Sequence, residues 1–312
     1  MSRKILLFLL ILALSISSRP APLQAREDAA QRILAAMSPA ERVGQLFIVS
    51  FVGQDVDPDS DIGQLIRDER VGGAVLLAAN KNFVNDDSAP FQVREATQQL
   101  QALALENGTL PLLISLDHEG DGWPYTRITG GMTPLPSPMA IGATWNLELA
   151  HEVGRVTGQE LSAAGVNLLL GPTVDVLSDP GSTSKGDLGT RVFGGDPYWV
   201  GRMGRAYIAG VHEGSQARVA TVAKHFPGHG GSDRLPDDEV ATVDKSLQEL
   251  RRIELAPFFA VTRFDGPEDP AVTEALMSSH IRYRGFQGNI RQFTAPISFD
   301  PDGIRTILAE EE

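Results

Sequence analysis

Residues 224–230, with the sequence Lys-His-Phe-Pro-Gly-His-Gly, bring one cation and two imidazoles together in a short stretch. The apolar run 219–223 before them is short and rich in β-branched residues, which predicts a buried strand. Pro227 and the glycine after it predict that this strand ends in a tight turn. Ligands of α/β barrels and sheets bind at the carboxyl ends of the strands. We therefore expect Lys224 and His225 to contact a bound ligand.

Two other interpretations of this segment stay open. Polar residues at the end of a strand are often simply solvated. Alternatively, His225 and His229 could bind a metal ion. Their spacing of four residues places two ligands on one side only in a helix, however, and Pro227 with Gly228 disfavours a helix. We expect neither a metal nor an organic cofactor.

The rest of the chain alternates between strand and helix patterns, which predicts an α/β fold with a parallel sheet. Strands are expected at 47–52, 72–77, 110–116, 166–170, 219–223 and 275–279, and helices at 26–43 with a restart at Ser38, 91–105, 148–164, 198–213, 244–259 and 301–312. Six such units are fewer than the eight of a (β/α)8 barrel, and the last helix has no stop signal. We expect one domain over residues 26–312, of TIM-barrel type and truncated at its carboxyl end.

The segment 224–230 resembles the motif of glycoside hydrolase family 3, and most of all its β-N-acetylglucosaminidase or β-N-acetylhexosaminidase branch. Further segments that resemble the family follow in the family's order at 37–47, 117–120, 172–176, 189–194 and 275–280. The resemblance covers residues 37–312. It implies a TIM-barrel O-glycosyl hydrolase of carbohydrate metabolism that cleaves terminal β-linked sugars.

Five residues match positions that contact the sugar in this family, namely Asp117, Arg127, Arg191, Lys224 and His225. A carboxylate accepts two hydrogen bonds at once, which suits a sugar diol. The guanidinium presents a fixed fork of donors to sugar oxygens or carboxylates. Asp117 could instead be a solvated loop acid, and Arg191 could form a structural salt bridge.

Two more polar residues are expected to support the site. Asp175 follows the fourth strand in a turn that resembles the family's Pro-x-x-Asp segment, and we interpret it as a residue that orients other side chains. His229 is expected to hold its loop by hydrogen bonds to the backbone.

The catalytic residues of the family have no clear match. Retaining glycosidases need a nucleophile and a general acid/base, and in this family the nucleophile is an Asp after the seventh strand, which this chain does not reach. The acid/base position of the branch corresponds to Asp237, where the branch has His. A carboxyl group serves as a general acid when its surroundings keep it protonated, so Asp237 is the candidate, with Asp238 and Glu239 as alternatives. A solvated acidic loop, or an acid/base from a second domain, stays open.

Composition excludes several other classes. The 312 residues carry a formal net charge of −13 and no cysteine. The negative charge disfavours nucleic acid and anionic membrane surfaces as partners, whereas a small sugar or an oligosaccharide is compatible with it. The absence of cysteine excludes disulfides and thiolate chemistry.

Residues 1–25 resemble a secretory signal, because Arg3 and Lys4 precede the apolar run 5–16. The run is short for a membrane span, and an uncleaved N-terminal anchor is the alternative. Either case predicts an extracellular or cell-envelope protein. The sequence thus predicts an exported β-N-acetylhexosaminidase. A β-glucosidase-like enzyme and a catalytically silent carbohydrate-binding protein are the alternatives.

Overall fold

The computed structural model describes residues 23–120, 128–177, 188–234, 236, 239–266 and 269–311. Six parallel strands form one sheet in the order β1-β2-β3-β4-β5-β7. They are β1 (Ile48–Ser50), β2 (Gly73–Val75), β3 (Leu113–Leu116), β4 (Leu168–Leu169), β5 (Ala220–Phe226) and β7 (Ala275–Ser278). A second sheet pairs β6 (Thr242–Val243) with β8 (Arg282–Tyr283). The expected α/β fold of TIM-barrel type, with six strands in sequence order, is confirmed.

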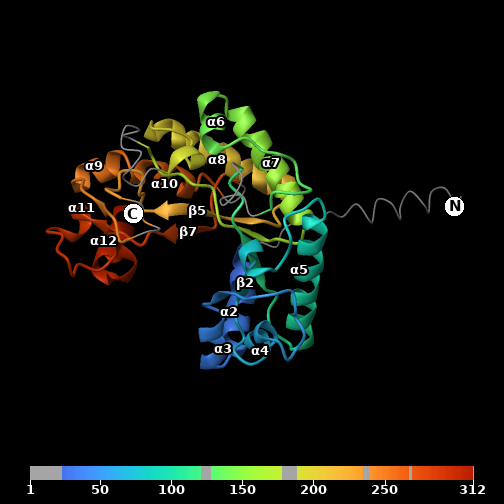
Figure 1. Cartoon of the computed structure of the whole chain (residues 1–312). Coiled ribbons are helices and arrows are strands. Elements are labelled where there is room, and N and C mark those ends of the chain that lie inside the picture. Colours follow the sequence, from blue (N-terminus) through green and yellow to red (C-terminus); the bar gives the residue numbers. More distant parts are fainter. Residues whose placement is uncertain are drawn as a thin grey trace, which may run out of the picture.

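Helices follow the strands along the chain. They are α2 (Leu23–Ala36), α3 (Pro39–Gly44), α4 (Asp61–Arg67), α5 (Ala89–Glu106), α6 (Pro138–Ala143), α7 (Leu147–Ala163), α8 (Pro197–Ser215), α9 (Leu247–Arg252), α10 (Leu255–Thr262), α11 (Arg284–Gln287) and α12 (Pro301–Glu311), with 3₁₀ turns η1 (Ala78–Asn80), η2 (Gly189–Arg191) and η3 (Ile297–Phe299). Figure 1 shows α6, α7 and α8 together on one side of β5 and β7, while α2, α3 and α4 lie away from α9 to α12.

The central strands β2, β4 and β5 are largely buried, as in other parallel sheets, whereas the edge strands β1 and β7 are partly exposed. The side chains of Ala74, Ile114 and Leu116 are completely buried. On the outside of the sheet, α7 and α8 pack so closely that a Cβ atom at Gly154 would overlap the carbonyl oxygen of Tyr207. Glycine is therefore required where these two helix backbones approach.

Two local expectations were wrong. The helix expected at 244–259 is two helices, α9 and α10, which are interrupted at Ile253 and Glu254. A proline ring clashes with the carbonyl of the residue four positions earlier, here Ile253, so Pro257 is tolerated only in the first turn of a new helix. In addition, β5 continues to Phe226, so Lys224 and His225 belong to the strand itself.

Three short helices were not expected, namely α4, α6 and α11. Ser60 caps α4, and Ser137 caps α6, which has Pro138 in its first turn. Both features are ordinary signals of a helix start. They were missed because the helices are too short to show a clear apolar period. Among the described residues, no helix is both long and apolar enough to cross a membrane.

Candidate active site

The polar residues of interest gather at the carboxyl edge of the sheet. Asp117 and Glu119 follow β3, Asp175 follows β4, and Lys224 lies near the end of β5. Because β3, β4 and β5 are adjacent and parallel, these strand ends lie at one edge, where barrel enzymes place their active sites.

Lys224 lies between two carboxylates. Its Nζ atom is 2.7 Å from Asp117 Oδ1 and 2.5 Å from Glu119 Oε1. The Lys224 side chain is 2% exposed and that of Glu119 4%, whereas Asp117 is 19% exposed. Burial opposes the ionisation of Glu119, but the charges of Lys224 and Arg191 outweigh it, so the pKa of Glu119 is lowered. Two of the three ammonium donors thus serve the protein's own carboxylates.

Arg191, in η2, completes this charged network. Its Nε donates to Glu119 Oε2 at 2.8 Å, and its second terminal nitrogen donates to Oε1 at 3.1 Å. This two-point geometry is the strong form of the arginine–carboxylate pair. The salt bridge that was the alternative interpretation of Arg191 is therefore present. A contact between Arg191 and a sugar stays a prediction.

Asp175 organises the two histidines of β5 and the turn after it. It is fully buried, its Oδ2 lies 2.7 Å from His225 Nδ1, and its Oδ1 accepts the backbone N–H of His229 at 2.8 Å. Burial opposes its ionisation, but His229 and His225 outweigh burial, and the pKa of Asp175 is lowered. These contacts agree with the expectation that Asp175 orients other side chains.

The tautomer of His225 follows from this contact. An ionised carboxylate can only accept, so Nδ1 of His225 carries the hydrogen. In the neutral ring Nε2 is then an acceptor, and it becomes a donor only when the ring is protonated. The neutral form of His225 would accept a hydrogen bond from a sugar hydroxyl, rather than donate one.

The comparisons with known proteins decide the family. Residues 39–311 match the family model described as "Glycosyl hydrolase family 3 N terminal domain". The chain belongs to this family.

Relatives and solved structures of family 3 agree with the match. The chain is 35% identical over 225 residues to a β-hexosaminidase of Hydrogenovibrio crunogenus, covering 69% of this chain and 55% of that protein. A β-hexosaminidase of Neisseria meningitidis serogroup C is 34% identical over 260 residues, covering 80% of this chain and 62% of the relative. The chain thus spans little more than half the length of these relatives.

Among solved structures, a family 3 β-N-acetylglucosaminidase from Paenibacillus superposes with a TM-score of 0.75 at 32% identity, covering 88% of this chain and 47% of that one. NagZ from Neisseria gonorrhoeae, in complex with N-trifluoroacetyl-D-glucosamine, gives a TM-score of 0.67 at 27% identity, covering 85% and 70%. The resemblance drawn from the 224–230 segment is therefore confirmed.

Of the sugar-contacting residues expected for family 3, the structure brings Asp117, Arg191 and Lys224 into one network and places His225 beside it on β5. Arg127 and Asp237 lie outside the described residues, as does Asp238, so their roles stay predictions.

The remaining acid of that loop has a partner on the surface. Glu239 is exposed and lies 3.0 Å from Arg234. This contact fits the interpretation of a solvated acidic face better than that of a buried general acid.

Glu119 is the residue that sequence reasoning missed. The resemblance pointed to Asp117, and Glu119 was treated as part of the surrounding motif. Yet Glu119 is central to the network, because it pairs with both Lys224 and Arg191. A second carboxylate two residues after Asp117, directly after a buried strand, was the signal in the sequence.

The role expected for His229 was wrong. In the part of the chain that the structure describes, neither ring nitrogen of His229 has a hydrogen-bond partner, and Nε2 lies 3.4 Å from Asp175 Oδ2. The ring stacks on His225 at 4.1 Å between centroids. Burial is the main reason why the pKa of His229 falls to about 3.

The argument that Pro227 and Gly228 keep the two histidines apart was also wrong. Ligand-type atoms of Asp175, His225 and His229 lie within 4.8 Å of one another. The carboxylate already bonds His225 and the His229 backbone. That no metal takes part stays a prediction.

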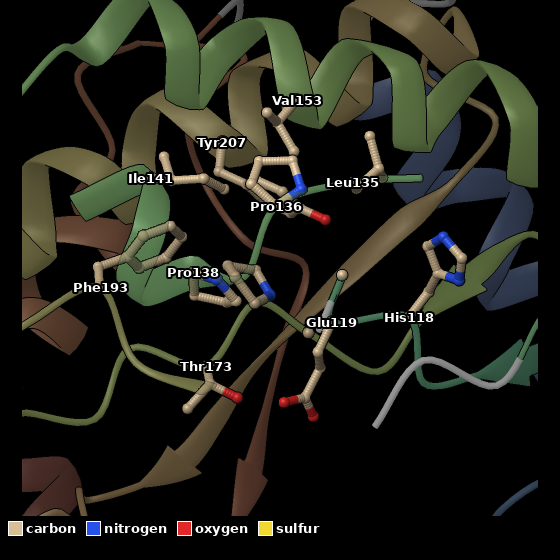
Figure 2. A pocket seen from close by; sticks show the side chains of 13 residues that line it. His118, Glu119, Leu135, Pro136, Pro138, Ile141, Val153, Thr173, Phe193 and Tyr207 are labelled. Carbon is tan, nitrogen blue, oxygen red and sulfur yellow. The ribbon is translucent and has the colours of Figure 1, made fainter. Parts of the chain in front are cut away.

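A small apolar cavity of about 20 Å³ lies behind Glu119, large enough for about one water molecule. Figure 2 shows Ile141, Val153 and Leu135 gathered on one side of it and the Thr173 hydroxyl directed toward the Glu119 carboxylate. Burial lowers the pKa of His118, which also lines this cavity, to about 4. The wall behind Glu119 is therefore mainly apolar.

Proposed function

We propose that this chain provides the sugar-binding face of a retaining β-N-acetylhexosaminidase, which cleaves terminal β-linked N-acetylhexosamine from oligosaccharides. The observation that carries the proposal is the network of Asp117, Glu119, Lys224 and Arg191 at the carboxyl edge of the sheet. The β-hexosaminidases among its relatives support the choice of sugar.

The network suits the recognition of sugar hydroxyls because its charges are fixed before the ligand arrives. Asp117 is its most exposed carboxylate, and a carboxylate can accept hydrogen bonds from two neighbouring hydroxyls. The charges of Lys224 and Arg191 hold Glu119 ionised, and the contact with Lys224 fixes the position of Asp117. Groups oriented in advance do not need to reorganise when the substrate binds.

Cleavage needs two further groups, a nucleophile and a general acid/base. We infer that the loop after β5 supplies the acid/base, with Asp237 as the candidate. Replacing Asp237, Asp238 and Glu239 one at a time by Asn or Gln in the complete gene product tests this. A large loss of hydrolysis for one variant supports the inference, and unchanged rates for all three would remove it.

The activity is tested with aryl β-N-acetylglucosaminide and aryl β-glucoside side by side, using the 312-residue chain and any longer product of the same gene. We expect turnover of the first substrate and a strong loss in Asp117→Asn. The matched control is Asp87→Asn, which changes an exposed loop acid. Preference for the glucoside would favour a β-glucosidase-like enzyme. Sugar binding without turnover of either substrate would favour a catalytically silent carbohydrate-binding protein.

We also propose that the protein is exported to the cell envelope or the medium. The basic start and the apolar run 5–16 support this. Fractionation followed by N-terminal sequencing tests the proposal. A mature N-terminus near residue 26 is expected, and an intact N-terminus in the cytoplasmic fraction would contradict export.

A further inference from the structure

A second cleft opens beside the charged network, between α6 and the first turn of α8. It has a volume of about 150 Å³. Its lining is mainly aromatic and apolar and includes one carboxylate: Met139, Trp145, Phe193, Asp196, Trp199 and Met203. Two of the three tryptophans of the chain are here. Ligand sites in proteins have this composition, with aromatic walls and a few polar groups that fix orientation.

The backbone of Trp145 is unusual. It follows the cap residue Thr144 of α6 and has a φ of +52°. Helices often end in this left-handed conformation, but the residue there is usually glycine or asparagine. Burial does not explain the choice of tryptophan, because 59% of this residue is exposed. A side chain kept in an unfavourable backbone conformation, yet open to solvent, points to a function for the side chain.

Two tryptophan rings, Trp145 and Trp199, line the cleft, and the ring of Tyr198 packs against Trp199 beside it. Trp145 packs edge-on against Trp199 at 5.2 Å between centroids, and Tyr198 packs against Trp199 at 5.7 Å. The guanidinium of Arg202 lies 5.6 Å above the Tyr198 ring and donates to its hydroxyl at 2.7 Å. Tyr198 is 62% exposed. Rings of this kind combine an apolar face with a polar tip.

The cleft adjoins the charged network through the chain itself. Phe193, in its floor, comes two residues after Arg191. A Cβ atom at Gly142 of α6 would overlap the carbonyl oxygen of Phe193, so α6 is packed directly on this segment. Phe193 is buried and lines both this cleft and the small cavity behind Glu119, so the cleft lies next to the charged network.

We propose that this cleft binds a second pyranose unit of a neutral β-linked glycan, so that the domain contacts its substrate beyond the terminal sugar. The C–H face of a pyranose packs on aromatic rings, and Asp196 offers an acceptor to hydroxyl groups. One Asp196 oxygen already caps α8 through the Trp199 N–H. The carboxylate and the net charge of −13 disfavour an anionic ligand. This inference rests on the proposed function, since it extends the same substrate.

The test compares N-acetylglucosamine with its β-1,4-linked tetramer, by isothermal titration calorimetry on the full 312-residue chain and on Trp145→Gly. Wild type should bind the tetramer more tightly than the monosaccharide. Trp145→Gly should weaken tetramer binding about five- to tenfold, as expected for one lost ring contact, and leave monosaccharide binding unchanged. Because glycine suits a positive φ, the variant should unfold at the same or a higher temperature, so that misfolding cannot explain the loss.

Tyr198→Ala removes a ring that packs against Trp199 beside the cleft and should weaken tetramer binding less than Trp145→Gly does. The control is Phe293→Ala, which removes a ring that is 93% exposed and not part of the cleft lining. Equal tetramer binding by wild type and Trp145→Gly would overturn the proposal, as would a wild type that shows no preference for the tetramer. Hydrolysis of the aryl monosaccharide tests the proposed function separately. If the aryl monosaccharide is not hydrolysed but tetramer binding depends on Trp145, the proposed activity is contradicted and the proposed sugar site in the cleft is supported.

Discussion

Arg191 and Glu119 are 72 residues apart in the chain and meet through two hydrogen bonds of 2.8 and 3.1 Å. The same carboxylate accepts from Lys224 of β5. Glu119 therefore joins the segments that follow β3 and β4 to the end of β5. The same three charges join these segments at the proposed sugar site.

Glu119→Gln should lower the free energy of unfolding by about 3 kcal/mol, because removing one partner of a buried ion pair leaves the other charge without compensation. Urea denaturation at neutral pH measures this. Glu95→Gln, on an exposed position of α5, is the control and should stay within about 0.5 kcal/mol of wild type. Equal free energies of unfolding for the two variants would mean that the charged network contributes little to the stability of the fold.

Lys224→Met should cost about 3 to 5 kcal/mol at neutral pH, since two carboxylates then lose their buried counter-charge. The loss should depend on pH. The lowered pKa of Glu119 in the wild type gives stability that is present above its unfolded value of 4.5 and is lost as the pH falls. The difference in the free energy of unfolding between wild type and variant should therefore be largest above pH 5 and should decrease toward pH 3. A gap that does not change with pH would show that packing of the lysine, and not its charge, matters.

The neutral imidazole of His118 should make the protein sensitive to acid. Its pKa is about 4 in the fold against 6.5 in the unfolded chain, so the unfolded state binds the proton first as the pH falls. Its contribution is complete above pH 6.5, and roughly 3 kcal/mol is lost by pH 4.

This contribution can be isolated by comparing wild type with His118→Leu from pH 7 to pH 4. His229 acts in the same direction, while burial raises the pKa of Glu254 to about 7, which gives the opposite slope. Both His229 and Glu254 remain in the variant. The difference between the two curves of unfolding free energy against pH therefore reports the contribution of His118. A difference in unfolding free energy that does not change between pH 7 and pH 4 would contradict the prediction.

Gly142→Ala should disturb the site from a distance. The added methyl would overlap the Phe193 carbonyl oxygen and force the segment that carries Arg191 away from α6. We expect a loss of about 1 to 3 kcal/mol together with weaker binding of N-acetylglucosamine. Ala140→Ser, on the exposed side of the same helix, is the control. Weaker stability with unchanged sugar binding would show that the segment relaxes without moving Arg191.

Much of the fold follows from local patterns. The buried strand before Lys224 and the start of α3 at its Ser38 cap follow from patterns of a few residues. In α3 the side chain of Ser38 accepts from Glu41 and the side chain of Glu41 accepts from Ser38, as the sequence suggests. The break between α9 and α10 is also signalled locally, by Pro257. The apolar period alone predicts one continuous helix there, because it does not take account of the clash that a proline makes inside a helix.

The site depends on distances that no local pattern contains. Lys224 and Asp117 are 107 residues apart and become neighbours only because β3, β4 and β5 pair side by side. The same holds for the stacking of His225 on His229, which the turn between them permits, and for the contact of Trp145 with Trp199 across two helices. The sequence by itself determined which residue types stand at the strand ends, since periodicity and capping are local. The tertiary structure decided which charges are paired with one another, because pairing depends on strand register and helix packing.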